Sequence, residues 1–157
     1  MTADVHWRCV AFDALHVREL DAIYAARQQV FVIEQQCLYL DVDGADVGSH
    51  HVSAWDGPGI DAALLAYARI VAPGIKYVEP AIGRVLTTAS ARGRGLGRAL
   101  IARAVEACRQ LYPDAAIRIS AQSHLEALYG SFGFVAQGER YLEDGIEHTE
   151  MLLAAGG

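Results

Sequence analysis

The stretch Arg92-Gly93-Arg94-Gly95-Leu96-Gly97-Arg98 carries most of the information about the fold of this chain of 157 residues. It joins an apolar, strand-like run over 81–88 to an amphipathic, helix-like run over 95–111. A glycine-rich turn that enters a helix exposes backbone N–H groups at the positive end of the helix dipole, where anions bind. Three arginines at the same helix start oppose the dipole unless an anion lies among them. The stretch therefore predicts a site for a phosphorylated ligand.

The spacing of these glycines excludes two familiar phosphate-binding motifs. Gly93, Gly95 and Gly97 alternate and so depart from G-x-G-x-x-G. A dinucleotide fold also needs an acidic residue about 20 positions further on, where only Asp114 is near, just before a strand. No Lys-Ser/Thr follows the glycines, which excludes a Walker A loop. A reductase or another enzyme with a nucleotide cofactor stays an alternative for the turn.

The composition indicates one folded domain over residues 1–157. Hydrophobic residues make up 53% of the chain and charged residues 20%, which does not fit disorder. No apolar run approaches the roughly 20 residues of a membrane span, and the first ten residues do not resemble a secretory signal. Three widely spaced cysteines predict a reducing, cytoplasmic setting. We expect Cys9 and Cys108 in the core and Cys37 exposed in a polar loop.

The charge is distributed unevenly along the chain. The formal net charge is −6, yet residues 84–109 hold six arginines against Glu106 alone. This segregation disfavours nucleic acid as a partner and favours one compact anion at the basic segment. The run 41–46 does not match a calcium loop, because its glycine is misplaced and its twelfth position is Val52. We expect a solvated loop there, and we predict no metal site. The acidic residues that we expect to attract a cationic amine are Glu34, Asp41, Asp43 and Asp46.

The periodicity of apolar residues predicts an alternation of strands and helices. The expected strands are 6–12, 51–55, 62–71, 81–88, 116–121, 134–141 and 146–153, and the expected helices are 17–31, 95–111 and 122–132. The strand–helix–strand unit in the middle implies one parallel strand pair, whereas the flanking hairpins imply antiparallel pairs. The fold class is therefore α/β, with a mixed, mostly antiparallel central sheet flanked by helices.

A second motif lies 32 residues after Gly97, in the run Leu128-Tyr129-Gly130-Ser131-Phe132-Gly133-Phe134. Together with the first motif and the element order, it resembles the GCN5-related N-acetyltransferase (GNAT) superfamily over nearly the whole chain. Other stretches are similar to the bacterial ElaA branch of that superfamily. They are 30–35 (VFVIEQ), 41–44 (DVDG), 66–69 (AYAR), 82–85 (IGRV) and 144–146 (DGI).

This resemblance implies a fold, a cosubstrate and a reaction. The GNAT fold splays two neighbouring parallel strands apart, and the pantetheine arm of acetyl-CoA enters the gap. By resemblance the turn Arg92–Arg98 binds the pyrophosphate, and Val85, Leu86 and Thr87 pair with the arm. Tyr129 matches the tyrosine that protonates the departing thiolate, and Gln122 stands where many relatives have asparagine. The implied activity is direct acetyl transfer to a primary amine of a small molecule or peptide in a ternary complex, and family members often form homodimers.

The reaction needs a general base more than it needs a general acid. An alkyl amine has a pKa of roughly 10.4, so about one molecule in a thousand is neutral at pH 7. A positioned base that removes the proton contributes about 10²–10⁴-fold. The leaving thiol has a pKa near 8.5, so a tyrosine is sufficient as the acid. The candidate bases are Glu79 and Glu34 first, then His124, or a water relayed from any of them. The alternative function is a non-catalytic acyl-CoA-binding module on the same fold.

Overall fold

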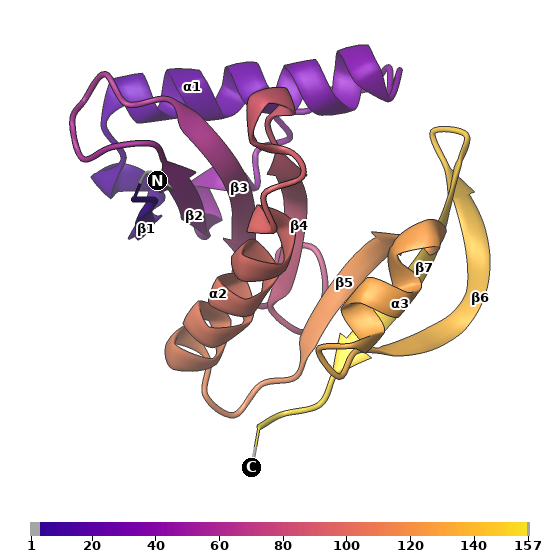
Figure 1. Cartoon of the computed structure of the whole chain (residues 1–157). Helices are drawn as coiled ribbons and strands as arrows, with labels where there is room; N and C mark the ends of the chain where they lie inside the picture. The colour runs from indigo at the N-terminus through magenta and orange to yellow at the C-terminus, as the bar shows by residue number, and fades with distance from the viewer. Residues whose placement is uncertain (1–3, 157) are drawn as a thin grey trace.

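The computed structural model describes residues 4–156 as a twisted seven-stranded sheet with helices on both faces (Figure 1). The strand order is β1-β2-β3-β4-β5-β7-β6. The strands are β1 (His6–Ala11), β2 (Ser49–Trp55), β3 (Leu64–Val71), β4 (Ala81–Thr87), β5 (Ile117–Gln122), β6 (Val135–Glu143) and β7 (Ile146–Leu153). The helices are α1 (Val17–Arg27), α2 (Leu96–Leu111) and α3 (Glu126–Gly130), and η2 (Gln28–Glu34) is a π-helical continuation of α1. Short 3₁₀ turns are η1 (Phe12–Ala14), η3 (Asp46–Gly48), η4 (Ala89–Ala91) and η5 (Ser123–Leu125).

The sheet is mixed in the way that the sequence predicts. Strands β4 and β5 are parallel and all other neighbours are antiparallel. The parallel pair meets only where Ala81 lies opposite Arg118, where the Arg118 N–H also donates to the Pro80 carbonyl. Beyond this point the two strands diverge (Figure 1). The splayed parallel pair of the expected GNAT fold is therefore present.

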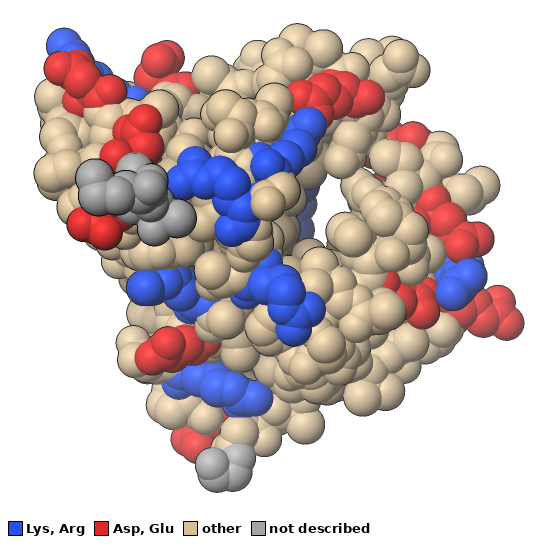
Figure 2. Space-filling model, viewed as in Figure 1, with Lys and Arg blue, Asp and Glu red and all other residues tan. Residues whose placement is uncertain are grey.

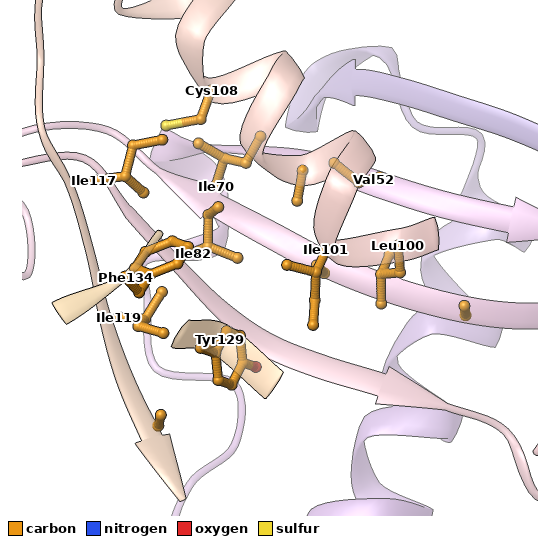
Figure 3. Packing of buried hydrophobic residues seen from close by; sticks show 14 of the residues in the cluster. Val52, Ile70, Ile82, Leu100, Ile101, Cys108, Ile117, Ile119, Tyr129 and Phe134 are labelled. Atoms are coloured by element: carbon orange, nitrogen blue, oxygen red, sulfur yellow. The ribbon is translucent and has the colours of Figure 1, made fainter. Parts of the chain in front are cut away.

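Two apolar clusters cover opposite faces of the sheet. On one face α2 packs Leu100, Ile101 and Cys108 onto Ile70 and Ile82, as Figure 3 shows. This cluster also takes in residues of β5 and β7, so it holds the two diverging halves together. On the other face α1 and η2 bring Ile23, Val30 and Phe31 against Tyr67, Leu86 and neighbouring side chains. Burial of each such large side chain contributes about 1.5–3 kcal/mol.

Some helix boundaries differ from the expectation. The helix expected over 17–31 is α-helical only to Arg27, and its last turns widen into the π-helix that ends at Glu34. The helix expected over 122–132 is shorter, because β5 runs through Gln122 and α3 begins only at Glu126. At the other end of the chain, Asp144 (φ 52°) and Gly145 (φ 77°) form the tight turn of the β6–β7 hairpin, as predicted.

Two of the three cysteine predictions are wrong. Cys108 is buried under α2 as expected, but Cys9 is exposed on the edge strand β1. Cys37 is buried, because the loop after η2 folds back over the sheet instead of extending into solvent. Within the described residues no helix is both long and apolar enough to cross a membrane.

Candidate active site

The divergence of β4 and β5 opens a cavity of about 590 Å³ in the middle of the sheet. Consecutive residues of both strands line it, namely Ala81–Val85 of β4 and Ile119–Gln122 of β5. Successive side chains of a strand point to opposite faces, so a cavity lined by consecutive residues passes between the strands. It therefore connects the face that carries α2 and α3 with the face that carries α1 and η2. Figure 2 shows the hollow between the two halves of the molecule.

A β-bulge interrupts β4 where it lines this cavity. Tyr67 pairs with Leu86 and Arg69 with Gly83, so Ala68 alone lies opposite two residues of β4. One of these two, Arg84, has φ 52°, a left-handed conformation that costs a non-glycine residue about 1–3 kcal/mol. Bulges leave backbone groups outside the ladder and occur next to active sites. The strain at Arg84 must be offset by its surroundings.

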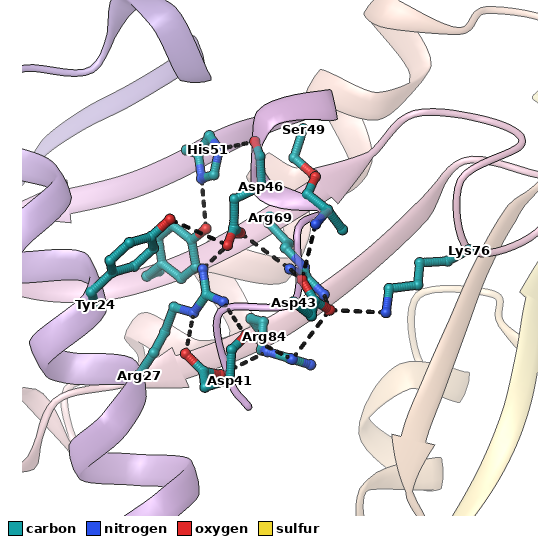
Figure 4. A network of polar contacts seen from close by, with 12 residues as sticks. Tyr24, Arg27, Asp41, Asp43, Asp46, Ser49, His51, Arg69, Lys76 and Arg84 are labelled. Carbon is teal, nitrogen blue, oxygen red and sulfur yellow. Dashed lines mark hydrogen bonds and ion pairs between the residues drawn. The ribbon is translucent and has the colours of Figure 1, made fainter. Parts of the chain in front are cut away.

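The loop 39–43 holds Arg84 in this conformation. The Arg84 guanidinium donates to Asp41 Oδ1 at 2.9 Å and to the Asp41 carbonyl at 3.1 Å, and it lies over the Tyr39 ring. Asp41 is itself held by Arg27, whose Nε donates to Asp41 Oδ2 at 2.8 Å. Arg27 Nη1 donates to Asp46 Oδ1 at 2.7 Å. Figure 4 shows how this network joins α1, the 41–46 loop, β3 and β4.

This network corrects the expectation of a solvated acidic loop. Asp41 is 4% exposed and Asp46 is 2% exposed, so both carboxylates are buried against arginines. Asp43 accepts from Arg69 and pairs with Lys76 at 2.9 Å. Burial by itself raises the pKa of Asp43, but its bonds to Arg69 and Lys76 outweigh burial and hold the pKa well below its usual range. These three aspartates are neutralised by the chain's own cations, so they cannot attract a cationic amine as predicted.

The glycine-rich turn lies at the start of α2, where the sequence predicts a socket for a phosphorylated ligand. Gly93 (φ 81°) and Gly95 (φ 73°) are left-handed, and Gly95 precedes the first helical residue. The first bond of the helix runs from the Ala99 N–H to the Gly95 carbonyl, so the preceding N–H groups of the turn lie outside the helical ladder. A Cβ on Gly97 would meet nothing within 4 Å, and its φ is ordinary. Packing within the described chain therefore does not require glycine at 97, whereas a ligand lying against the backbone would.

Arginine side chains surround this socket. Figure 2 shows Lys and Arg gathered on the α2 face beside the hollow, and Arg92, Arg94 and Arg98 are all exposed. Arg98 lies over the Phe132 ring and donates to Ser131 Oγ at 3.3 Å, which ties the turn to the end of α3. The socket and α3 thus lie together on one face of the sheet.

Tyr129 of α3 lies on the same face and lines the cavity. Its ring packs edge-on to Phe134, with 6.0 Å between centroids, and contributes to the core cluster (Figure 3). Burial raises the pKa of the Tyr129 hydroxyl to about 12, so it stays protonated at neutral pH. Burial is the sole cause of this shift, and no group of residues 4–156 is hydrogen-bonded to the hydroxyl, which leaves it available to a ligand.

The residues predicted to contact the pantetheine arm are only partly in the cavity. Val85 lines it, whereas Leu86 is buried on the α1 side and Thr87 lies beyond the lining. Gln122 lines the cavity and donates from Nε2 to Gln35 Oε1 at 2.9 Å. This bond crosses the gap between the C-terminal end of η2 and β5.

The candidate bases from the sequence do not line the cavity. Glu79 receives two hydrogen bonds from Arg118, at 2.9 and 3.2 Å, and these lower its pKa. Glu34 receives a hydrogen bond from Arg92 at 2.7 Å, which lowers the pKa of this exposed carboxyl as well. His124 is exposed in η5. None of the three belongs to the residues around the cavity.

The structure instead places polar residues of the last hairpin in the cavity wall. His148 lines it, its ring stacks on Tyr141, and the Tyr141 hydroxyl is hydrogen-bonded to Ser120 Oγ of β5. The two-residue turn at 144–145 fixes the register in which Tyr141 lies opposite His148. The sequence predicts a hairpin here, whereas the pairing of Tyr141 with His148 and its position at the cavity come from the structure. Within the described residues no cluster of His, Cys, Asp and Glu has the arrangement of a metal site.

Comparisons with known proteins agree with this geometry. The sequence model of the family described as "Acetyltransferase (GNAT) domain" matches residues 27–155. A UPF0039 protein of Synechocystis sp. is 41% identical over 149 residues, 95% of each chain. Among solved structures, an acyl-CoA N-acyltransferase from Pseudomonas aeruginosa is 42% identical, with a TM-score of 0.89 over 96% of this chain and 100% of the other. Escherichia coli ElaA is 35% identical, with a TM-score of 0.87 over 96% and 99% of the two chains.

Proposed function

This chain belongs to the GNAT acetyltransferase family, and on that premise we propose that it transfers the acetyl group of acetyl-CoA to a primary amine by direct attack in a ternary complex. One observation carries the proposal. The cavity runs through the sheet between β4 and β5, with the glycine socket and Tyr129 on one face and an open, polar wall on the other. Two substrates can therefore enter from opposite faces and meet at the bulge.

The residues of the α2 face fit coenzyme A. The free N–H groups at the start of α2 and the exposed arginines match a pyrophosphate. The open space at Gly97 lets a ligand lie against the backbone. The widening gap beside Val85 accepts an extended arm, which would pair with β4 as an added strand. The thioester supplies an activated acetyl group next to the bulge at Arg84.

Different residues of the cavity stabilise the oxyanion, protonate the thiolate and admit the amine. A backbone N–H freed by the bulge, with Val85 the nearest candidate, stabilises the oxyanion that forms on the thioester carbonyl. Tyr129, protonated and without a partner in the described chain, donates a hydrogen bond and then its proton to the departing thiolate. The amine enters from the α1 face, past Gln35 and the tip of the last hairpin. The acceptor is an amine of a small molecule or peptide.

Calorimetry with coenzyme A, with NAD(P) as the comparison, tests the binding half of this proposal. We expect heat with coenzyme A alone and at least a tenfold loss of affinity when Arg92 and Arg94 are both replaced by glutamate. The matched control is Arg103→Glu, which reverses the charge of an exposed arginine of α2. Arg103 lies over the Trp7 ring, two turns away from the socket. An unchanged affinity in the Arg92→Glu, Arg94→Glu double variant would contradict the proposed socket.

An amine panel with detection of the free thiol tests the catalytic half, with a reaction lacking acceptor as the blank. Turnover with a primary amine supports the proposal. Tight binding of acetyl-CoA without turnover against any amine would identify the chain as a non-catalytic acyl-CoA-binding module. Heat with NAD(P) and none with coenzyme A would favour a nucleotide-cofactor enzyme instead.

A further inference from the structure

We propose that His148 is the group that accepts the proton of the acceptor amine, through its Nε2 atom. This inference rests on the proposed acyl transfer and adds a catalytic residue to it. His148 is the histidine of β7 that lines the cavity between β4 and β5, and its side chain is 12% exposed. It lies opposite Gln122 in the β5–β7 pairing, so both side chains are on the α1 face. This is the face from which the amine enters.

The hydrogen bonds of the ring determine which nitrogen is basic. Nδ1 of His148 lies 2.7 Å from the Ile146 carbonyl oxygen. A carbonyl oxygen only accepts, so Nδ1 carries the hydrogen and the lone pair of the neutral ring is on Nε2. Stacking on Tyr141, with 5.9 Å between centroids and 25° between planes, fixes the ring orientation. The ring is therefore held in the tautomer that a general base needs.

Charged and titratable groups from several elements surround the His148 ring. The nearby carboxylates are Glu143, Asp144 and Glu150. The other titratable groups in the cavity wall or beside it are Cys37, Tyr39, Asp43, Arg69, Lys76, Tyr77, Arg84, Tyr129 and Tyr141. Glu150 is paired with Arg118, and the three cations, Arg69, Lys76 and Arg84, are bound by aspartates of the 41–46 loop. Glu143 Oε2 lies 3.7 Å from Nε2 of His148, so its negative charge is available to stabilise the protonated ring.

The bound ammonium gives one proton to Nε2 of His148, and the freed nitrogen lone pair attacks the thioester carbonyl carbon. The C–N bond forms while the carbonyl π pair moves to oxygen. The carbonyl then re-forms, the C–S bond breaks with its electron pair on sulfur, and Tyr129 protonates the thiolate. The remaining excess proton on nitrogen returns to the Tyr129 oxygen through solvent, and His148 releases its proton to bulk water. The sum is ammonium plus acetyl-CoA giving amide, coenzyme A and one proton.

Long-range ¹H–¹⁵N spectroscopy of the free protein tests the tautomer without any turnover. The His148 resonance is identified by its loss in His148→Gln. We expect Nδ1 to carry the hydrogen in the neutral ring and Nε2 to show the shift of a bare nitrogen. The reverse tautomer would place the lone pair toward Ile146 and overturn the proposal.

Kinetics with the best amine of the panel test the role itself. We expect His148→Gln to lower kcat/KM about 10²-fold, to abolish the acid limb of its pH profile, and to leave the affinity for coenzyme A unchanged. In His148→Ala, added imidazole should restore turnover, because the missing base is returned to the space that the ring occupied. His6→Gln is the matched control, since His6 lies in β1 at the far edge of the sheet.

The alternatives give distinct results. An acid limb that persists in His148→Gln, or one that disappears in Glu79→Gln or Glu34→Gln instead, overturns the assignment to His148. Absence of rescue by imidazole in a folded His148→Ala variant that binds coenzyme A does the same. Absence of turnover in the wild-type chain with every amine overturns the proposed function, and the base with it. The wild-type reaction therefore distinguishes the two failures.

Discussion

Replacement of Arg27 by methionine tests whether the buried ion network holds the 41–46 loop on the sheet. Methionine keeps an apolar side chain of comparable length but removes the charge. Arg27 is fully buried, and its guanidinium makes three hydrogen bonds of 2.7–2.8 Å, to Asp41 Oδ2, the Asp41 carbonyl and Asp46 Oδ1. The substitution leaves these acceptors buried without their main donor.

The size of the expected stability loss depends on which cations still contact Asp41 and Asp46 after the substitution. Asp41 keeps Arg84 at 2.9 Å, and Asp46 keeps Arg69 at 3.1 Å, so neither carboxylate is left without a cation. Removal of one partner of a buried ion pair costs about 3–5 kcal/mol. That cost applies to a carboxylate left without any cation, so we expect a loss near its lower end, about 3 kcal/mol, which is a large part of the roughly 5–15 kcal/mol that stabilises a typical domain. The corresponding fall in Tm is about 6–12 °C for a chain of this size.

Urea unfolding at pH 7, followed by tryptophan fluorescence and circular dichroism, measures this loss. Arg18→Met is the matched control, because Arg18 pairs with Asp61 at the surface. The Arg18 side chain is 62% exposed and the Asp61 side chain is 87% exposed. Surface pairs of this kind contribute about 0–1 kcal/mol. A loss in Arg27→Met no larger than in the control, with an unchanged m-value, would refute the idea that the network fastens the loop.

Three further perturbations have expected outcomes of stated sign. Gly97→Ala should raise the free energy of unfolding by about 0.5–1 kcal/mol, because alanine is the better helix former. The same substitution should weaken coenzyme A binding in calorimetry. An unchanged affinity would contradict a ligand at the socket. The lowered pKa of Asp43 makes the unfolded chain bind more protons than the folded chain in acid, so the contribution of Asp43 to stability is complete above about pH 5 and is lost as the pH falls further. Asp43→Asn should therefore flatten the decline of the urea midpoint between pH 5 and pH 3. A thiol-reactive probe read by mass spectrometry should label Cys9 first and Cys37 and Cys108 slowly, because Cys9 is exposed whereas the other two thiols are buried and out of reach of the probe.

The parts of the fold that depend on residues close together in the sequence were predictable from the sequence. Apolar spacing gave the element order, and a strand–helix–strand unit can return to the sheet only as a parallel neighbour, which placed the β4–β5 pair correctly. The glycine turn and Tyr129 belong to local motifs, so both could be named from the sequence. The π-helical turn from Gln28 could not, because Val30 and Phe31 keep helical spacing while the backbone widens.

What escaped prediction depends on contacts between distant elements. The sequence predicts solvated aspartates in the 41–46 loop because their cations come from α1, β3 and β4, at separations of 14, 26 and 43 residues. Glu79 and Glu34 look like free carboxylates for the same reason. The pairing of Tyr141 with His148 follows from the Asp-Gly turn, but only the folded hairpin shows that the pair faces a cavity.

The single pairing of β4 with β5 at Ala81 and Arg118 also bears on how the protein behaves at high concentration. Where the strands diverge, each presents a row of main-chain donors and acceptors without a strand beside it, so the sheet has interior edges as well as the outer edges at β1 and β6. Unpaired edges are templates for strand exchange between molecules and for aggregation. An extended molecule seated between the strands would occupy those interior edges. Its presence should therefore keep concentrated solutions clear for longer than those of the bare chain, an effect that light scattering can follow.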